Sequence, residues 1–171
     1  IVMPVGTPMV KVENTRRHGA EIVISGATLE EAAEFARAHG KAHDLTMIHP
    51  YDDPLIIAGQ GTIALEMLQA VPQLDTVVVP IGGGGLISGI AVAARAIKPD
   101  LRIVGVQAEL YPSMYNVIKG EHLPMRGDTL AEGIAVKAPG QITAPIVGEL
   151  VDDILLVSEP QIEHAVSLLI N

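Results

Sequence analysis

Cysteine is absent from this chain of 171 residues, and its absence excludes several kinds of chemistry. Without thiols the chain forms no disulfide bond, offers no thiolate ligand to zinc and carries no cysteine nucleophile. Aromatic residues make up only 2% of the sequence, so there is little for single-stranded nucleic acid to stack on. The apolar residues are mainly aliphatic, which is typical of helices packed on a parallel sheet.

The chain also contains few positively charged residues. Eleven Lys and Arg residues stand against twenty Asp and Glu residues, which gives a formal net charge of −9. A surface of this charge repels nucleic acid and anionic membranes, so neither is expected as a partner. No apolar run approaches the roughly 18 residues of a membrane-spanning helix, and no charged-then-apolar leader opens the chain. With the lack of cysteine, these features favour a cytoplasmic protein.

The first part of the chain is patterned as alternating strands and helices. Strands are expected at residues 1–4, 21–25 and 41–48, and helices at residues 7–19 and 28–39. Thr7 is placed to cap the first helix before Pro8. Thr28 and Glu31 form a capping box for the second helix, which is expected to stop at Gly40.

A loop with two prolines and two acidic residues, 49–54, marks the expected boundary between two units, residues 1–48 and 49–171. Beyond it, residues 59–62 lead into a helix that ends before Pro72. Further helices are expected at residues 86–97, 111–119, 142–150 and 158–171, and strands at 76–79, 102–107 and 154–157. A strand, helix and strand in this order imply a right-handed crossover, so the fold class is α/β: a parallel twisted sheet with helices on both faces, in two subdomains.

The helix at residues 86–97 should be the most buried helix. Its apolar stripe consists of Leu86, Ile90, Ala93, Ala94 and Ile97. Gly89 lets a neighbouring backbone come close. A carboxylate at Ile90 is expected to unfold the chain, whereas one at Arg95 is expected to be tolerated.

Four consecutive glycines separate the strand at 76–79 from this helix. They are Gly82, Gly83, Gly84 and Gly85. Glycines bring bare N–H groups close to a ligand, and the helix N-terminus that follows favours negative charge. A triphosphate loop is excluded, because Leu86 and Ile87 stand where Lys and Ser or Thr are needed. A dinucleotide fingerprint fits poorly, although Glu109 after the next strand could bind a ribose, so a site for one phosphate monoester is favoured over an empty turn.

Other polar residues give weaker signals. Ser88 either contacts the phosphate or satisfies an N–H group of the helix. The acid pairs at 52–53 and 152–153 are interpreted as solvated turn residues, and the six histidines show no metal-ligand spacing. His39 and His43 are four residues apart, but Gly40 is expected to end their helix.

Residues 80–91 resemble the tetraglycine phosphate loop of the fold type II pyridoxal phosphate enzymes. Three more segments, 58–66, 105–109 and 131–136, resemble the same family in the same order, as does the stretch from Thr7 to Gly19. Together they narrow the resemblance to the threonine ammonia-lyases, also called threonine dehydratases, and to the related serine racemases. The resemblance covers essentially the whole chain.

This resemblance implies pyridoxal 5′-phosphate as the cofactor, held between two domains. Residues 1–48 would be part of the smaller domain and residues 49–171 part of the larger one. The cofactor-binding residues would be Gly82, Gly83, Gly84, Gly85, Leu86, Glu132 and Gly133, with the last two near the pyridine ring. His49, Pro50 and Tyr51 would line the substrate side.

The implied reaction deaminates L-threonine, and L-serine, to a 2-oxo acid and ammonia through loss of the α-proton and the β-hydroxyl. Serine racemase or another hydroxyamino-acid dehydratase is the alternative, and a non-catalytic module that binds a nucleotide or phosphate is the alternative from another class. A small amino acid is the expected partner, and the full-length enzyme is expected to be a homo-oligomer, with a role in isoleucine biosynthesis.

Three functional groups of the family do not match any position of this chain. The Schiff-base lysine and the loop that binds the substrate carboxylate would precede Ile1, and the hydroxyl group at the pyridine nitrogen would follow Asn171. The chain is therefore expected to be an internal piece that contains no catalytic residue and is inactive alone. Glu109 matches one acid of the racemase cation site, but Tyr115 stands at the second position, so no metal site is expected. Lys137 is the only lysine that follows an apolar stretch, and for it too a non-catalytic role is favoured over Schiff-base chemistry.

Overall fold

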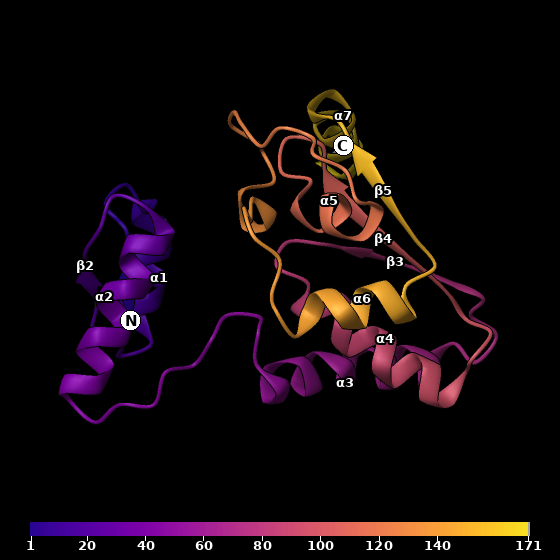
Figure 1. Ribbon diagram of the computed structural model, residues 1–171, viewed down its shortest axis with the longest axis horizontal. Coiled ribbons are helices and arrows are strands. Elements are labelled where there is room, and N and C mark those ends of the chain that lie inside the picture. Colours follow the sequence, from indigo (N-terminus) through magenta and orange to yellow (C-terminus); the bar gives the residue numbers. More distant parts are fainter. Residues whose placement is uncertain (171) are drawn as a thin grey trace. The chain divides into compact units, whose positions relative to one another are not determined.

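The chain divides between Ile48 and His49 into two units, Ile1–Ile48 and His49–Asn171. They are seen in a computed structural model that describes residues 1–170 (Figure 1). Each unit has its own parallel sheet. The division lies at the start of the segment that holds two prolines and two acidic residues.

The first unit is a small sheet with two helices. Strands β1 (Val2–Met3) and β2 (Val23–Ile24) pair in parallel, and the helices are α1 (Met9–Arg17) and α2 (Leu29–Ala42). Its buried apolar residues are Val12 of α1 and Ala32 of α2. The predicted capping of α2 is confirmed, because the hydroxyl oxygen of Thr28 accepts a hydrogen bond of 3.2 Å from the Glu31 amide.

Three predictions for this unit are wrong. Thr7 does not cap α1; its hydroxyl donates instead to the carbonyl oxygen of Pro4, 2.8 Å away. Helix α2 continues through Gly40 to Ala42, and the strand expected at residues 41–48 does not form. The cause is a local turn, since the Leu45 amide donates back to the carbonyl oxygen of Gly40 at 2.9 Å and not to a strand.

The second unit contains three parallel strands in the order β3-β4-β5, and their parallel pairing is the one that the sequence predicts. The strands are β3 (Thr76–Pro80), β4 (Arg102–Ala108) and β5 (Asp153–Val157). The helices are α3 (Pro54–Ala70), α4 (Gly85–Ile97), α5 (Ser113–Lys119), α6 (Thr143–Leu150) and α7 (Glu159–Ile170), with a 3-10 turn η1 (Glu132–Ile134). In Figure 1, α3, α4 and α6 lie together on one side of the strands, and α7 lies on the other.

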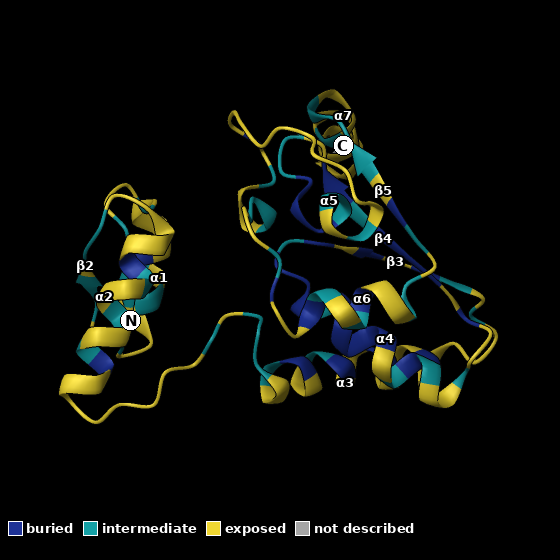
Figure 2. Ribbon diagram, in the orientation of Figure 1, coloured by how far each residue is buried: buried dark blue, intermediate teal, exposed yellow. Residues whose placement is uncertain are grey.

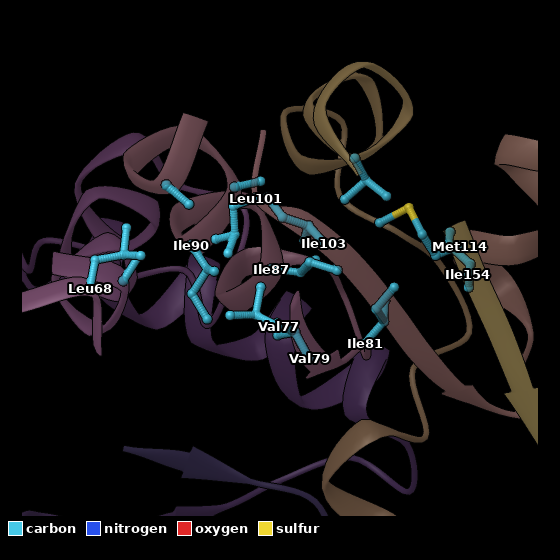
Figure 3. Packing of buried hydrophobic residues seen from close by; sticks show 14 residues of the cluster. Leu68, Val77, Val79, Ile81, Ile87, Ile90, Leu101, Ile103, Met114 and Ile154 are labelled. Carbon is cyan, nitrogen blue, oxygen red and sulfur yellow. The ribbon is translucent and has the colours of Figure 1, made fainter. Parts of the chain in front are cut away.

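The core of this unit lies between β3, β4 and α4. Burial alternates along β3, as expected for a strand with one face on a core, and Val77 and Val79 point inward. Figure 3 shows these side chains meeting Ile87 and Ile90 of α4, with Ile103 of β4 beside them. Figure 2 shows the same buried band running through α4 and the sheet.

Helix α4 is the most buried helix of the described residues, as predicted, but its buried face is wider than the predicted stripe. Ile90 and Ala94 are buried, whereas Ile97 is exposed. Ile87 and Ala91, outside the predicted stripe, are fully buried. The reason is that α4 packs against α3 and α6 as well as the sheet, so more than one face of the helix is covered.

Helix α3 begins at Pro54, ahead of residues 59–62, which were predicted to lead into it. Asp53 caps it, since one carboxylate oxygen accepts hydrogen bonds from the amides of Leu55 at 2.8 Å and Ile56 at 3.2 Å, and Pro54 occupies the first turn. Gly61 therefore lies inside the helix instead of ahead of it. The interpretation of Asp53 as a solvated turn residue is wrong.

Arg95 does not project freely into solvent. Its guanidinium group donates to the carbonyl oxygens of Leu150, at 3.0 and 3.2 Å, and of Leu101, at 2.9 Å. It also lies 2.9 Å from the carboxylate of Asp152. Because Arg95 joins α4 to the turn between α6 and β5, a carboxylate at this position is now expected to destabilise the unit.

Candidate functional site

The glycine loop joins the end of β3 to the start of α4. The Ile81 amide donates the last sheet hydrogen bond, to the carbonyl oxygen of Val106 at 2.8 Å. Gly84 then adopts a left-handed conformation, with φ of 98°, and α4 begins at Gly85. No side chain caps this helix end. The loop therefore presents a helix N-terminus whose first amides have no capping side chain.

The two kinds of polar backbone group in the loop have different partners. The carbonyl oxygen of Gly83 accepts from the Thr143 hydroxyl at 2.6 Å and from the Gly140 amide at 3.2 Å. The carbonyl oxygen of Gly84 accepts from the Ser88 amide at 3.0 Å. Within residues 1–170, the amides of residues 82–84 donate no hydrogen bond to other groups of the protein. The loop thus turns its carbonyl groups toward the protein and keeps its N–H groups for an anion.

The space around the glycines is filled by other parts of the same unit. A Cβ atom at Gly83 would overlap the ring of Tyr51, and one at Gly84 would lie 2.6 Å from Met114 and 2.8 Å from Thr143. At Gly82 a Cβ atom would lie 3.2 Å from Ile134. The glycines are therefore required for internal packing as well as for any close approach of a ligand to their N–H groups. A run of glycines in the sequence does not tell these two requirements apart.

Tyr51 is half-buried against this loop, and Pro50 beside it is exposed. The Tyr51 hydroxyl donates to the carbonyl oxygen of Ala138 at 3.2 Å, and its ring meets that of His49 edge to face at 4.8 Å between centroids. The Nδ1 atom of His49 accepts a 2.8 Å hydrogen bond from the Asp52 amide, so the ring proton belongs on Nε2. Residues 49–52 thus form an ordered support for the loop.

Asp52 lies at the site, although the sequence pattern predicts a solvated turn residue at this position. Its carboxylate accepts hydrogen bonds from the amides of Gln141 and Ile142, each at 2.9 Å, and of Thr143 at 3.2 Å. These amides open α6, so Asp52 caps that helix and is not a solvated turn acid. The partners lie about ninety positions away in the sequence, and no local pattern indicates the pairing.

The other predicted cofactor residues gather at the same loop to different degrees. Glu132 and Gly133 lie in the exposed turn η1, whose last residue, Ile134, packs against Gly82. Leu86 is half-buried in the first turn of α4. Ser88 is fully buried and donates to the carbonyl oxygen of Thr143 at 3.4 Å, which is neither of its two predicted roles.

The strongest electrostatic perturbations lie away from the loop. The Ile103 amide and the Arg95 guanidinium hold the pKa of Asp152 below its usual value, and Lys119 beside Asp153 lowers the pKa of that carboxyl group. Both carboxylates have partners, so they are not simply solvated turn residues. Because they lie at the start of β5, we interpret their role as stabilising the fold there.

The histidines and acids give no metal cluster in the described part of the chain, where no group of three His, Asp or Glu residues is positioned around one point. His43 directly follows the last residue of α2, and its ring lies 4.1 Å from that of His39 between centroids. Glu109 is exposed after β4. None of the helices in residues 1–170 is long and apolar enough to cross a bilayer.

Comparison with known protein families gives one match over the complete chain. Residues 1–171 match the family described as "Pyridoxal-phosphate dependent enzyme". Among curated proteins, the L-threonine ammonia-lyase of Geobacter sulfurreducens is 46% identical over 174 residues, which cover 100% of this chain and 43% of the relative. The catabolic L-threonine dehydratase TdcB of Staphylococcus aureus is 43% identical over 169 residues, which cover 96% of this chain and 48% of the relative.

Solved structures agree with the sequence comparison. Maize serine racemase superposes with a TM-score of 0.90 at 36% identity, over 98% of this chain and 51% of that one. The processed form of threonine deaminase isoform 2 from Solanum lycopersicum gives a TM-score of 0.84 at 37% identity, over 92% of this chain and 44% of that one. The predicted α/β fold is therefore confirmed, and the chain spans about half the length of the proteins that it matches.

Proposed function

The chain belongs to the family of pyridoxal-phosphate-dependent enzymes, and from this premise we propose that the whole protein is a threonine ammonia-lyase. Its substrate would be L-threonine, with L-serine as a second substrate, and its products a 2-oxo acid and ammonia. Curated relatives named for this activity, at 46% and 42% identity over the complete chain, support the proposal. The chain covers 43% of each of these two relatives, and it contains the whole of the glycine loop described above.

The observation that carries the proposal is the set of unengaged amides at the start of α4. A phosphate monoester needs several free backbone donors, and residues 82–84, which have no side chains of their own, offer amides that donate to no group of the described chain. The other helix end at the loop, that of α6, is already capped by Asp52. The residues present therefore fit the phosphate of pyridoxal 5′-phosphate, which Gly82 to Gly85 and Leu86 would hold.

The chain's remaining residues would position the cofactor and the substrate. When bound, pyridoxal phosphate supplies an electron sink for loss of the substrate's α-proton. Glu132 and Gly133 would lie beside its ring, because their turn packs on the loop through Ile134. Tyr51 and Pro50 would line the substrate side. In this proposal residues 1–48 belong to the smaller domain and residues 49–171 to the larger one.

Serine racemase is the second candidate, and the match to the maize enzyme at a TM-score of 0.90 supports it. The ammonia-lyase is preferred, because curated relatives with that name are more similar in sequence, at 46% against 36% identity. The proposal also includes a homo-oligomer in the cytoplasm and a role in amino-acid metabolism, in isoleucine biosynthesis. The acidic, cysteine-free composition supports the cytoplasmic location.

The test uses the full-length protein, stripped of cofactor and then supplied with pyridoxal 5′-phosphate. Formation of a 2-oxo acid and ammonia from L-threonine, dependent on the cofactor, is the expected result. Faster formation of D-serine from L-serine, measured by chiral chromatography, would assign the protein to the racemases instead. Cofactor binding without either product would identify a non-catalytic phosphate-binding module and overturn the proposal.

A further inference from the structure

We propose that Thr143 and Asp52 are positioning residues that aim the amides of the glycine loop at the cofactor phosphate. The inference rests on the proposed function, because it takes the loop as the phosphate site. It concerns two side chains that do not belong to the loop and whose importance no local sequence pattern indicates. Both lie in the unit His49–Asn171, as the loop does.

Thr143 fixes one carbonyl group of the loop. It is completely buried, and its hydroxyl donates to the Gly83 carbonyl oxygen at 2.6 Å. The same hydroxyl oxygen accepts from the Gly140 amide at 3.1 Å, which leaves its own proton for Gly83. The Gly140 amide also lies 3.2 Å from the Gly83 carbonyl oxygen. The orientation of this carbonyl group is therefore set by a buried, fully paired hydroxyl group.

Fixing the Gly83 carbonyl group also fixes the next amide. The peptide bond between Gly83 and Gly84 is trans and planar, so the Gly84 N–H points opposite to the Gly83 carbonyl group. Since Thr143 holds that carbonyl group on the protein side, the Gly84 N–H is directed to the other side. The left-handed φ of 98° at Gly84 then starts α4 with the Gly85 amide at its N-terminus. A turn without this restraint could rotate the peptide and lose the donor.

Asp52 holds Thr143 in place through hydrogen bonds to the start of α6. Its carboxylate accepts from the amides of Gln141, Ile142 and Thr143, which form the start of α6. Gly140 allows this approach, because a Cβ atom there would overlap the Asp52 carboxylate. A carboxylate that satisfies α6 also removes that helix end as a competing anion site, since its amides are already engaged. Asp52 therefore fixes the start of α6, the start of α6 positions Thr143, and Thr143 orients the carbonyl group of Gly83.

The experiment compares two ligands of the cofactor-free, full-length protein: pyridoxal 5′-phosphate and pyridoxal, which lacks the phosphate. We expect Thr143→Val to weaken the binding of pyridoxal phosphate about tenfold, the order expected for one hydrogen bond, and to change the affinity for pyridoxal less than about twofold. Thr143→Ser keeps the hydroxyl group, so its ratio of the affinity for pyridoxal phosphate to the affinity for pyridoxal should equal that of the wild type. The ³¹P chemical shift of the bound phosphate should change in Thr143→Val and not in Thr143→Ser.

Asp52→Asn tests the second residue and remains informative should Thr143→Val fail to fold. It should lower the same affinity ratio by about threefold, because the amide keeps one acceptor oxygen and loses the charge. If both residues act along one route, the double variant should lose less than the product of the two single losses. A loss equal to that product would overturn the coupled action of Asp52 and Thr143.

Thr62→Val is the matched control. Its hydroxyl also donates to a backbone carbonyl oxygen, that of Gly59 at 2.8 Å, but it lies on the exposed side of α3. This variant should leave the affinity ratio unchanged. An equal loss for both ligands in Thr143→Val, or no loss, would overturn the positioning inference and leave the proposed function standing. A wild-type protein that binds pyridoxal as tightly as pyridoxal phosphate would overturn both.

Discussion

Gly61 of α3 and Gly89 of α4 face each other with no side chain between them. A Cβ atom on Gly89 would lie 2.6 Å from the Gly61 nitrogen and would overlap the carbonyl oxygen of Ile57, and one on Gly61 would lie 3.0 Å from the Gly89 oxygen. These two helices share the most extensive contact between elements of the described chain. Since α4 also carries the glycine loop at its start, this close approach supports the candidate site.

Gly89→Ala is expected to destabilise the protein by roughly 1–3 kcal/mol, because the added methyl group meets rigid backbone and pushes α3 off α4. The measurement is the free energy of unfolding in denaturant. The loss should exceed the gain of helix propensity that alanine brings, which is about 1 kcal/mol.

Gly59→Ala is the control on the same helix α3. A Cβ atom at Gly59 meets nothing within 4 Å, so here the propensity gain of up to about 1 kcal/mol should appear as increased stability. Equal effects of Gly59→Ala and Gly89→Ala would show that the helices do not pack as described.

The close approach at Gly89 could be predicted from the sequence, whereas the start of α3 could not. Strand 76–79 and helix 86–97 were located to within a residue, because a β-branched run and a continuous apolar period of helical spacing are strong local signals. Gly59 and Gly61 resemble helix breakers locally, and only the contact between Gly61 and Gly89 makes a glycine favourable inside α3. A tertiary contact here outweighs local propensity.

Part of the candidate site could also be predicted from the sequence, and part could not. The glycine loop was visible in the sequence, because four adjacent glycines between a strand and a helix form a local pattern. Asp52 and Thr143 were not identified, since their amide contact joins residues 91 positions apart. Arg95 was misjudged for the same reason, as its carbonyl partner Leu150 lies 55 positions away. Local periodicity carries no information about such pairs.

Asp53→Ala should destabilise the protein by about 1 kcal/mol, because the amides of Leu55 and Ile56 lose their acceptor at the start of α3. The midpoint of thermal unfolding measures the effect. Asp53→Asn is the matched control, since asparagine caps helices about as well as aspartate and should leave the midpoint nearly unchanged. An asparagine variant as unstable as the alanine variant would argue against capping.

Asp152 predicts a pH dependence with a definite sign. The Ile103 amide, 2.6 Å from its carboxylate, and then Arg95 lower its pKa from the usual 3.8. A carboxyl group whose pKa is lowered by folding stabilises the protein above its unfolded pKa, and this contribution is lost as the pH falls through the folded pKa.

The difference in unfolding midpoint between the wild type and Asp152→Asn should therefore be largest near neutral pH and should shrink below about pH 4. Thermal unfolding between pH 3 and pH 7 measures it. The side chain is 41% exposed, so a modest difference is expected. A difference that stays constant with pH would mean that the ionised form makes no special contact.

The last prediction concerns the lysine that would form the covalent link to the cofactor in the proposed enzyme. The five lysines of the chain are Lys11, Lys41, Lys98, Lys119 and Lys137. Lys98 donates to the carbonyl oxygen of Pro72 at 3.3 Å, and Lys119 pairs with Asp153 at 3.2 Å. Lys137 is exposed and lines a cavity of about 460 Å³ with Asn116 and His122. A catalytic lysine needs a desolvated or electropositive pocket, and this cavity does not supply one.

Borohydride reduction of the full-length protein with bound cofactor should therefore attach the pyridoxyl group to a lysine outside these 171 residues. Peptide mapping by mass spectrometry locates the group. Lys137→Ala is the control and should retain both the label and ammonia release from L-threonine. A labelled peptide that contains Lys137, together with loss of turnover in Lys137→Ala, would place the catalytic lysine inside this chain and contradict the prediction.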